Sequence, residues 1–301
     1  FTNRACKEMR QRIAALAGQP AAQVQIRTIH SFCGWLLRQA PAALTDIGPD
    51  FTVCDEAGCL EAVREVVFQS TGREIEERPA RILQQFLELC KDCLLLAGSS
   101  DPFRGASLAF STRQKALERI CTTPQRRFDP KFFAFLQKYG GSILQLYNLK
   151  LTQANQLDFS DLLLRAALLM EDPAFDHLWR GRWRFVQVDE VQDVSLGEYR
   201  LVSRLCQGAR VLFCGDFNQT IYQWRGSDPA ALLARYREEF APVEVRLDHN
   251  YRSDPQLLAL AQRFLCRAFG QGQAPQAPRG QRVQLRELET AEEEARWLAR
   301  S

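Results

Sequence analysis

The sequence predicts an α/β fold in which parallel strands alternate with helices, and three observations lead to this prediction. Short apolar runs at residues 185–188 and 210–214 have the length and composition of buried strands in a parallel sheet. A helix-like segment follows each run, at residues 196–206 and after Asp228-Pro229. This alternation is typical of a parallel sheet flanked by helices. Between residues 51 and 156 strand signals are sparse, so an inserted helical subdomain is expected to interrupt the sheet.

The first 50 residues predict two helices and one short strand. Apolar residues recur at helical spacing over residues 4–17, and Gly18-Gln19-Pro20 is expected to end that helix. Residues 24–26 predict a short strand, and a second helix is expected from about residue 31 to 39. Residues 41–49 are rich in proline, alanine and glycine and predict a break.

Helical periodicity dominates the middle of the chain. Residues 57–69 and 81–97 place apolar side chains three and four positions apart, with turns expected near residues 98–101, 122–124 and 140–141. The remaining expected elements are a helix at residues 158–170 that begins at a carboxylate, a second lobe that begins at 243–247, a helix at 254–269, a flexible loop at 270–280, a strand at 283–285 and a helix at 292–300.

Length and composition limit the classes of protein to which the chain can belong. A chain of 301 residues that is 46% hydrophobic can bury a sizeable core in two or three subdomains. No apolar run approaches the roughly 20 residues that span a membrane, and no signal peptide opens the chain. We therefore expect a cytoplasmic protein.

The ten cysteines are scattered through apolar segments, which predicts reduced core thiols. Cys90 and Cys93 have the spacing of metal ligands, but no second such pair or histidine accompanies them, so a metal or iron–sulfur role is the less favoured interpretation. The net charge of +3 is small, but basic residues outnumber acids in residues 1–38 and 113–150. Separate basic faces suit phosphate contacts, although a solvated helix face explains the second region equally well.

Adjacent carboxylates, Asp189 and Glu190, follow the apolar run that ends at Val188. A metal-assisted nucleotide hydrolase needs such a pair, because one acid holds Mg²⁺ while its neighbour positions or deprotonates the attacking water. The alternative is that these acids only cap a following helix. Gly215-Asp216 repeats the pattern after the second apolar run. Tyr251 and Arg252 place an aromatic ring beside a guanidinium, suited to stacking on a base and to countering phosphate charge.

The order and spacing of these segments resemble the UvrD/Rep-like DNA helicases of superfamily 1. The similarity rests on ordered segments that span residues 1 to 253: Phe1-Thr2-Asn3-Arg4-Ala5, Thr28-Ile29-His30-Ser31-Phe32-Cys33, Leu157-Asp158-Phe159-Ser160-Asp161, Val188-Asp189-Glu190-Val191-Gln192-Asp193, Gly215-Asp216-Phe217-Asn218-Gln219 and Asn250-Tyr251-Arg252-Ser253. The resemblance implies a RecA-like P-loop NTPase lobe at residues 1–44 and 158–242, an all-helical inserted subdomain at 45–157 and the beginning of a second RecA-like lobe at 243–301.

The resemblance also implies roles in ATP hydrolysis. Asp189 would be the Mg²⁺ ligand and Glu190 the catalytic base. Gln219 would sense the γ-phosphate, and Arg252 would reach that phosphate from the second lobe. The remaining expected ATP-binding residues are Gln192, which would link the site to the γ-phosphate, Asp216, which would steady magnesium or its water shell, and Tyr251, which would stack on adenine. The alternative for Tyr251 and Arg252 is packing at a domain interface.

Another set of residues is expected to bind single-stranded DNA. Its members are Phe1, Thr2, Asn3, His30, Ser31, Tyr222, Trp224 and Arg225. Trp224 would stack on a base, with a core position as the alternative. Arg225 pairs either with a phosphate or with an acidic neighbour, and a lone histidine such as His30 is usually just a satisfied polar residue.

One family motif is missing from the sequence. A phosphate-binding loop needs glycines for its backbone and a lysine for the outer phosphates, and the chain contains no Gly-Lys dipeptide. The simplest interpretation is a fragment whose loop would lie upstream of Phe1, and the other is a degenerate relative. Either way, these 301 residues alone should not hydrolyse ATP well. Val194-Ser195 and Phe217 also depart from the family pattern, which shifts the subfamily more than the chemistry.

The resemblance therefore implies an ATP- and Mg²⁺-dependent, 3′-to-5′ DNA helicase and single-stranded-DNA translocase, here as a fragment. Its expected partners are single-stranded and partly duplex DNA and proteins of repair or recombination. Two alternatives remain: the motor subunit of a helicase–nuclease recombination complex, and a degenerate module that binds DNA or a partner without catalysis.

Overall fold

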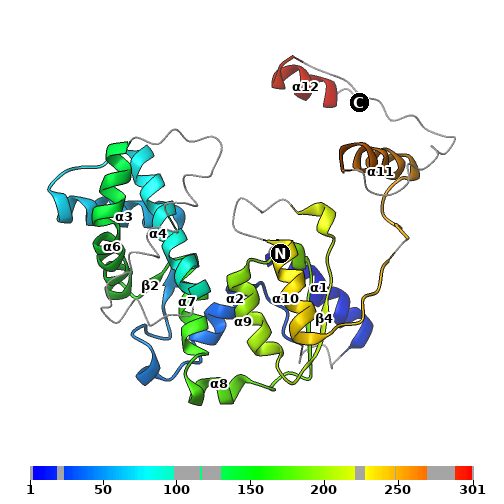
Figure 1. Cartoon of the computed structure of the whole chain (residues 1–301), viewed down its shortest axis with the longest axis horizontal. Coiled ribbons are helices and arrows are strands. Elements are labelled where there is room, and N and C mark those ends of the chain that lie inside the picture. The colour runs from blue at the N-terminus through cyan, green and yellow to red at the C-terminus, as the bar shows by residue number, and fades with distance from the viewer. Residues whose placement is uncertain are drawn as a thin grey trace. The chain divides into compact units, whose positions relative to one another are not determined.

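The computed structural model describes residues 3–18, 24–97, 116, 130–220, 228–247, 249–269 and 289–299 (Figure 1). The chain divides into two compact units, residues 1–241 and 242–301. In chain order the described elements of the first unit are α1 (Asn3–Ala17), α2 (Ile29–Leu37), the 3-10 helix η2 (Ala42–Leu44), β1 (Thr52–Val53), α3 (Glu56–Thr71), α4 (Glu77–Ala97), α6 (Pro130–Gln153), β2 (Gln156–Leu157), α7 (Phe159–Leu169), α8 (Pro173–Trp179), β3 (Phe185–Val188), η3 (Val191–Asp193), α9 (Leu196–Cys206), β4 (Arg210–Phe213), η4 (Phe217–Gln219) and α10 (Pro229–Phe240).

Helices form most of the first unit, and their starts follow local capping chemistry. Asp55 accepts a hydrogen bond from the Gly58 N–H at the start of α3, and Asp158 accepts one from the Asp161 N–H at the start of α7. Helices α3, α4 and α6 pack on one another, α4 also packs on α7 and α9, and α2 packs on α7. One continuous apolar core therefore extends through these helices.

The chain enters and leaves the segment that contains α3, α4 and α6 at neighbouring points. β1 and β2 pair in parallel, with Thr52 opposite Gln156, so the segments that flank α3, α4 and α6 lie side by side. Asn155 reinforces the junction, because its side chain accepts a hydrogen bond from the Gly48 N–H (2.9 Å) and donates one to Asp50 Oδ1 (2.9 Å).

β3 and β4 form a second parallel pair, with Phe185 opposite Arg210 and Val188 opposite Phe213. One face of this pair packs on α9 and α10, where the rings of Phe213 and Tyr236 stack 4.2 Å apart. The other face is open, since Phe185 is 66% and Leu212 is 54% exposed. The prediction of parallel strands is thus confirmed, and the expectation that residues 185–188 form a buried strand is wrong.

Most of the predicted helices are confirmed, including α1, α2, α7, α9, α10 and α11 (Pro255–Phe269), with ends shifted by a few residues at most. Two local predictions are wrong: the short strand at residues 24–26, and the turn at residues 140–141, which lie inside the continuous helix α6. Residues 24–28 have no regular structure and lead directly into α2. Their backbone is held instead by a side chain, because the Arg10 guanidinium donates a hydrogen bond to the Ile26 carbonyl.

The second unit contains two described helices, α11 and α12 (Ala291–Leu298). Residues 243–247, where the second lobe was expected to begin, have no regular structure, and Val243 and Leu247 are 90% and 92% exposed. The loop predicted at 270–280 and the strand predicted at 283–285 lie outside the described residues.

Seven of the nine described cysteines are buried, and all nine are free thiols, as expected for core residues. Cys90 and Cys93 are both buried on α4, and the part of the chain that the structure describes has no group of three or more potential metal-ligating side chains. In that same part, no helix is both long and apolar enough to cross a membrane.

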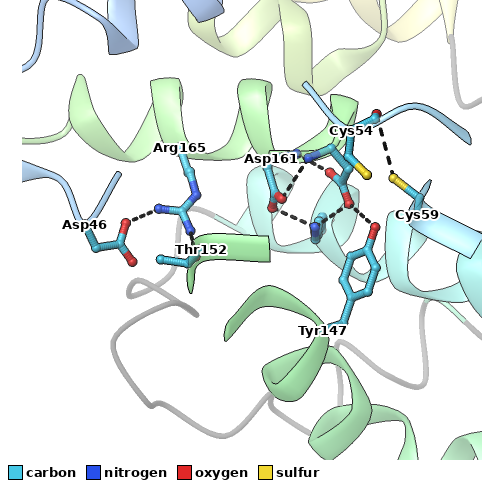
Figure 2. A network of polar contacts seen from close by, with 9 residues as sticks. Asp46, Cys54, Cys59, Tyr147, Thr152, Asp161 and Arg165 are labelled. Atoms are coloured by element: carbon cyan, nitrogen blue, oxygen red, sulfur yellow. Dashed lines mark hydrogen bonds and ion pairs between the residues drawn. The ribbon is translucent and has the colours of Figure 1, made fainter. Parts of the chain in front are cut away.

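A buried ion cluster joins α4 and α6 to α7. The Lys91 ammonium, on α4, lies 2.6 Å from both Asp158 Oδ2 and Asp161 Oδ1, and the Tyr147 hydroxyl, on α6, donates a hydrogen bond to Asp158 Oδ2 (3.1 Å). Lys91 and Asp161 are each 1% exposed. Figure 2 shows this network beside a second contact, in which Arg165 bonds Asp46 and Thr152.

Asp161→Asn is expected to reduce the pH dependence of stability. Burial, and then the Asp158 charge, raise the pKa of Asp161 to about 6. Because this lies above the unfolded value, the group's contribution to stability is full below about pH 4 and is lost as the pH rises through about 6. An asparagine cannot titrate, so the free energy of unfolding of the wild type minus that of the variant should fall by on the order of 1–3 kcal/mol between about pH 4 and 7. Urea denaturation across this range measures the difference, and a constant difference would contradict the expectation.

Candidate active site

The parallel pairing of β3 and β4 brings two polar segments together. Backbone hydrogen bonds continue beyond the strand ends, from the Cys214 N–H to the Val188 carbonyl (2.8 Å) and from the Val191 N–H to the Cys214 carbonyl (3.0 Å). Asp189 and Glu190 therefore lie beside Gly215 at the carboxyl edge of the pair. In open α/β sheets, ligands bind at this edge.

Glu190 has an unusual backbone conformation. Its φ of 52° and ψ of 42° lie in the left-handed region, which costs about 1–2 kcal/mol for a residue other than glycine. The Glu190 N–H bonds the neighbouring Asp189 Oδ1 (3.0 Å), and the 3-10 helix η3 follows at once. This tight turn leaves the Glu190 side chain exposed, and the Asp189 side chain half-buried, at the strand end.

Gln192 links the two polar segments. This side chain is only 2% exposed, and both ends of its amide are bonded. Gln192 Nε2 donates to Glu190 Oε2 (2.7 Å), and Gln192 Oε1 accepts from the Asp216 N–H (3.1 Å). The Asp216 carboxylate in turn accepts a hydrogen bond from Gln219 Nε2 (2.8 Å). A continuous chain of hydrogen bonds thus joins four of the predicted site residues.

Gly215 makes room for this link. A Cβ atom at position 215 would lie 2.5 Å from Gln192 Oε1 and 3.2 Å from the Val191 backbone nitrogen. Any side chain would displace the Gln192 amide from between the two segments. The glycine is therefore required by a close approach rather than by its own φ.

Asp193 adds a fourth acid at this edge, beside Asp189, Glu190 and Asp216. Burial, and then the Glu190 charge, raise the pKa of Asp193. Among the described residues, its Oδ1 atom is buried and has no hydrogen-bond partner.

Mg²⁺ bound with a nucleotide commonly takes only one or two carboxylates and completes its shell with phosphate and water. Asp189 and Asp216 offer carboxylates of this kind, and their binding of magnesium stays a prediction.

The predicted DNA-binding residues are described only in part. Thr28 caps α2 by accepting a hydrogen bond from the Ser31 N–H (3.1 Å), which places Ser31 and His30 in the first turn of that helix. The His30 ring meets the Phe159 ring edge-on, with 5.7 Å between centroids. Asn3 is exposed as the first residue of α1. Phe1, Thr2, Tyr222, Trp224 and Arg225 lie outside the described residues.

Tyr251 and Arg252 belong to the second unit. Tyr251 is 93% exposed, and the Arg252 N–H donates a hydrogen bond to Asn250 Oδ1 (2.9 Å). Their approach to Glu190 and Gln219 stays a prediction.

Sequence reasoning missed the contribution of Ser195 and Glu198. The Ser195 hydroxyl caps α9 by accepting a hydrogen bond from the Glu198 N–H. The Glu198 carboxylate accepts one from the Ser195 N–H, and the two bonds together form a capping box. A serine followed three residues later by a glutamate is the sequence signal for this motif. Here it fixes the start of α9 directly after the polar segment that carries Glu190.

The fold and this edge define an α/β protein whose polar side chains gather at the carboxyl ends of two parallel strands. A family model described as the UvrD/REP helicase N-terminal domain matches residues 1–240. The chain therefore belongs to the UvrD/REP helicase family.

Curated relatives match over most of this chain. It is 28% identical over 279 residues to ATP-dependent DNA helicase UvrD1 of Mycobacterium tuberculosis, covering 90% of this chain and 33% of the relative. It is 29% identical over 265 residues to ATP-dependent DNA helicase Rep of Escherichia coli (87% and 35%), and 25% identical over 263 residues to ATP-dependent DNA helicase PcrA of Bacillus subtilis (87% and 32%). The chain spans about a third of the length of these relatives.

Proposed function

We propose that the protein is an ATP-dependent DNA helicase and single-stranded-DNA translocase that moves 3′ to 5′. The observation that carries this proposal is the hydrogen-bonded chain from Glu190 through Gln192 and Asp216 to Gln219. It connects the acid suited to activating water with the amide suited to sensing a phosphate. Family membership and the names of the relatives, all ATP-dependent DNA helicases, support the same activity.

The side chains of the first unit would divide the work of hydrolysis. Asp189, aided by Asp216, would hold Mg²⁺, which would supply charge neutralisation at the phosphates. Glu190 would accept a proton from the attacking water, since its exposed carboxylate is already oriented by the Gln192 amide. Gln219 would report the γ-phosphate through its bond to Asp216. From the second unit, Arg252 would reach that phosphate and Tyr251 would stack on the base.

The DNA strand would contact the first turns of α1 and α2. Asn3, His30 and Ser31 are the described residues of this surface. Phe1, Thr2, Tyr222, Trp224 and Arg225 would extend it.

For the domain organisation, we propose a first motor lobe at residues 1–44 and 158–242, a helical insertion at 45–157 and the start of a second lobe at 243–301. The side-by-side pairing of β1 and β2 supports an insertion that begins and ends near these boundaries. The 301 residues contain no Gly-Lys dipeptide of a phosphate-binding loop, so the chain alone is expected to hydrolyse ATP poorly. The working compartment would be the bacterial cytoplasm, at the nucleoid, with proteins of repair or recombination as partners.

ATPase activity with and without single-stranded DNA tests the proposal, in a protein that contains this chain and two complete motor lobes. Turnover that rises strongly with single-stranded DNA would support the motor. DNA binding without any turnover would overturn it and leave a non-catalytic binding module.

A further inference from the structure

His30 lies against the first turn of α9. Its Nδ1 atom is 3.7 Å from Glu198 Oε1, and the two side chains are only 25% and 15% exposed. The edge contact with Phe159 limits where the imidazole can move. The Glu198 charge also reaches Cys33, one turn further along α2, where burial first and then this carboxylate raise the pKa of the thiol. Glu198 is therefore turned toward the face of α2 that carries His30.

The other oxygen of the Glu198 carboxylate accepts a hydrogen bond at the start of α9, next to the segment that carries the proposed hydrolysis site. Glu198 Oε2 accepts a hydrogen bond from the Ser195 N–H (2.8 Å), and the Ser195 hydroxyl accepts one from the Glu198 N–H (3.2 Å). Ser195 follows η3 after one intervening residue, Val194, whose N–H bonds the Val191 carbonyl (3.2 Å). η3 carries Gln192, whose amide bonds Glu190. Glu198 is therefore connected to the proposed catalytic base through Ser195, η3 and the Gln192 side chain.

We propose that Glu198 is a positioning residue that couples single-stranded-DNA contact at α2 to the setting of Glu190. This inference rests on the proposed function. A strand that contacts His30 or shifts the first turn of α2 changes the contact between His30 and one oxygen of Glu198. The carboxylate is rigidly shared with the Ser195 N–H, so the change reaches the turn that orients Gln192 and Glu190. DNA binding would thereby alter turnover without any direct contact between DNA and the ATP site.

Glu198→Gln tests the coupling in a protein with both motor lobes. An amide oxygen still accepts the hydrogen bond from the Ser195 N–H, but the carboxylate charge that faces His30 is gone. We expect turnover without DNA and the affinity for single-stranded DNA to stay unchanged, while the stimulation of turnover by DNA falls at least about fivefold, the lower end of typical coupling between sites. In a His30→Gln background, the same change should add little, because contacting residues give non-additive effects.

Ser195→Ala is the matched control. It removes the capping hydroxyl, which weakens the start of α9, but keeps both the Ser195 backbone N–H and the His30–Glu198 pair. DNA stimulation should therefore survive in this variant. Hydrogen exchange gives a readout independent of activity, because residues 190–198 should change protection on addition of single-stranded DNA in the wild type but not in Glu198→Gln.

The outcomes distinguish a failure of the proposed function from a failure of the coupling alone. Wild-type protein without DNA-stimulated turnover would overturn the proposed function and the coupling with it. Normal stimulation in the wild type and an equal stimulation in Glu198→Gln would overturn the coupling alone. The coupling also fails if Ser195→Ala loses as much stimulation as Glu198→Gln, because the effect would then reflect helix stability.

Discussion

Replacing Glu190 by glutamine is expected to abolish most ATP turnover in a protein with two complete motor lobes. The amide keeps the size of the side chain and can still accept the hydrogen bond from Gln192 Nε2, so the turn and the link to Asp216 should persist. What disappears is the carboxylate that would take the proton from water. Loss of such a general base typically costs about 10²–10⁴ in rate, which steady-state ATPase assays with saturating single-stranded DNA would measure.

Measurements of DNA binding show whether a loss of ATP turnover comes from lost catalysis or from lost DNA binding. Affinity for single-stranded DNA should be unchanged, since the proposed DNA surface lies on α1 and α2 rather than at Glu190. Glu61→Gln, on the exposed side of α3, is a suitable control and should turn over at the wild-type rate. A Glu190→Gln protein that keeps more than about a tenth of wild-type kcat would remove Glu190 from the role of base.

Lys91→Met is expected to give a large loss of stability. Methionine fills a similar volume, but the change leaves Asp158 and Asp161 buried without the cation that lies 2.6 Å from each. Removing one partner of a buried ion pair typically destabilises a protein by about 3–5 kcal/mol, because the remaining charge stays desolvated. Urea denaturation of the wild type and the variant at neutral pH would measure the difference in the free energy of unfolding.

Arg81→Met provides the comparison for Lys91. Arg81 also bonds two carboxylates, those of Glu56 (2.7 Å) and Glu77 (2.9 Å), but all three side chains are at least half exposed. Water solvates these carboxylates when the arginine is lost, so its removal should change the urea midpoint far less. Equal losses in the two variants would show that burial adds nothing to the importance of Lys91. Adding Asp158→Asn and Asp161→Asn to Lys91→Met should recover part of the lost stability.

Local patterns were enough to predict most of the secondary structure. The apolar runs at β3 and β4, and the helical spacing of α1, α9 and α11, carry their own signals within a few residues. The failures came where a neighbour decides the outcome. Residues 24–26 alternate like a strand but pair with no strand in the described part of the chain. An apolar run such as that of β3 indicates a parallel strand but does not show whether both of its faces are covered.

The candidate site was predictable as a set of residues rather than as a geometry. Glu190 and Gln219 stand out because acids and amides follow strand ends. Their connection through Gln192 depends on the register between β3 and β4, which no local pattern specifies. The pairing of His30 with Glu198 and that of Lys91 with Asp158 likewise join positions far apart in the sequence. Such contacts arise from helix packing, so single-sequence reasoning had no means of finding them.

The parallel junction of β1 and β2 has an evolutionary consequence. Since Thr52 and Gln156 are opposite each other, the chain departs and returns within one strand spacing, roughly 4.8 Å. The strand pairing therefore fixes where the connecting polypeptide begins and ends, but not its length. Descendants of this gene can vary the connections within this segment while the edge at Glu190 stays as it is, provided that α4 keeps its packing on α7 and α9. The buried ion cluster sets the main condition, because a replacement must still offer Asp158 and Asp161 a cation where Lys91 now stands.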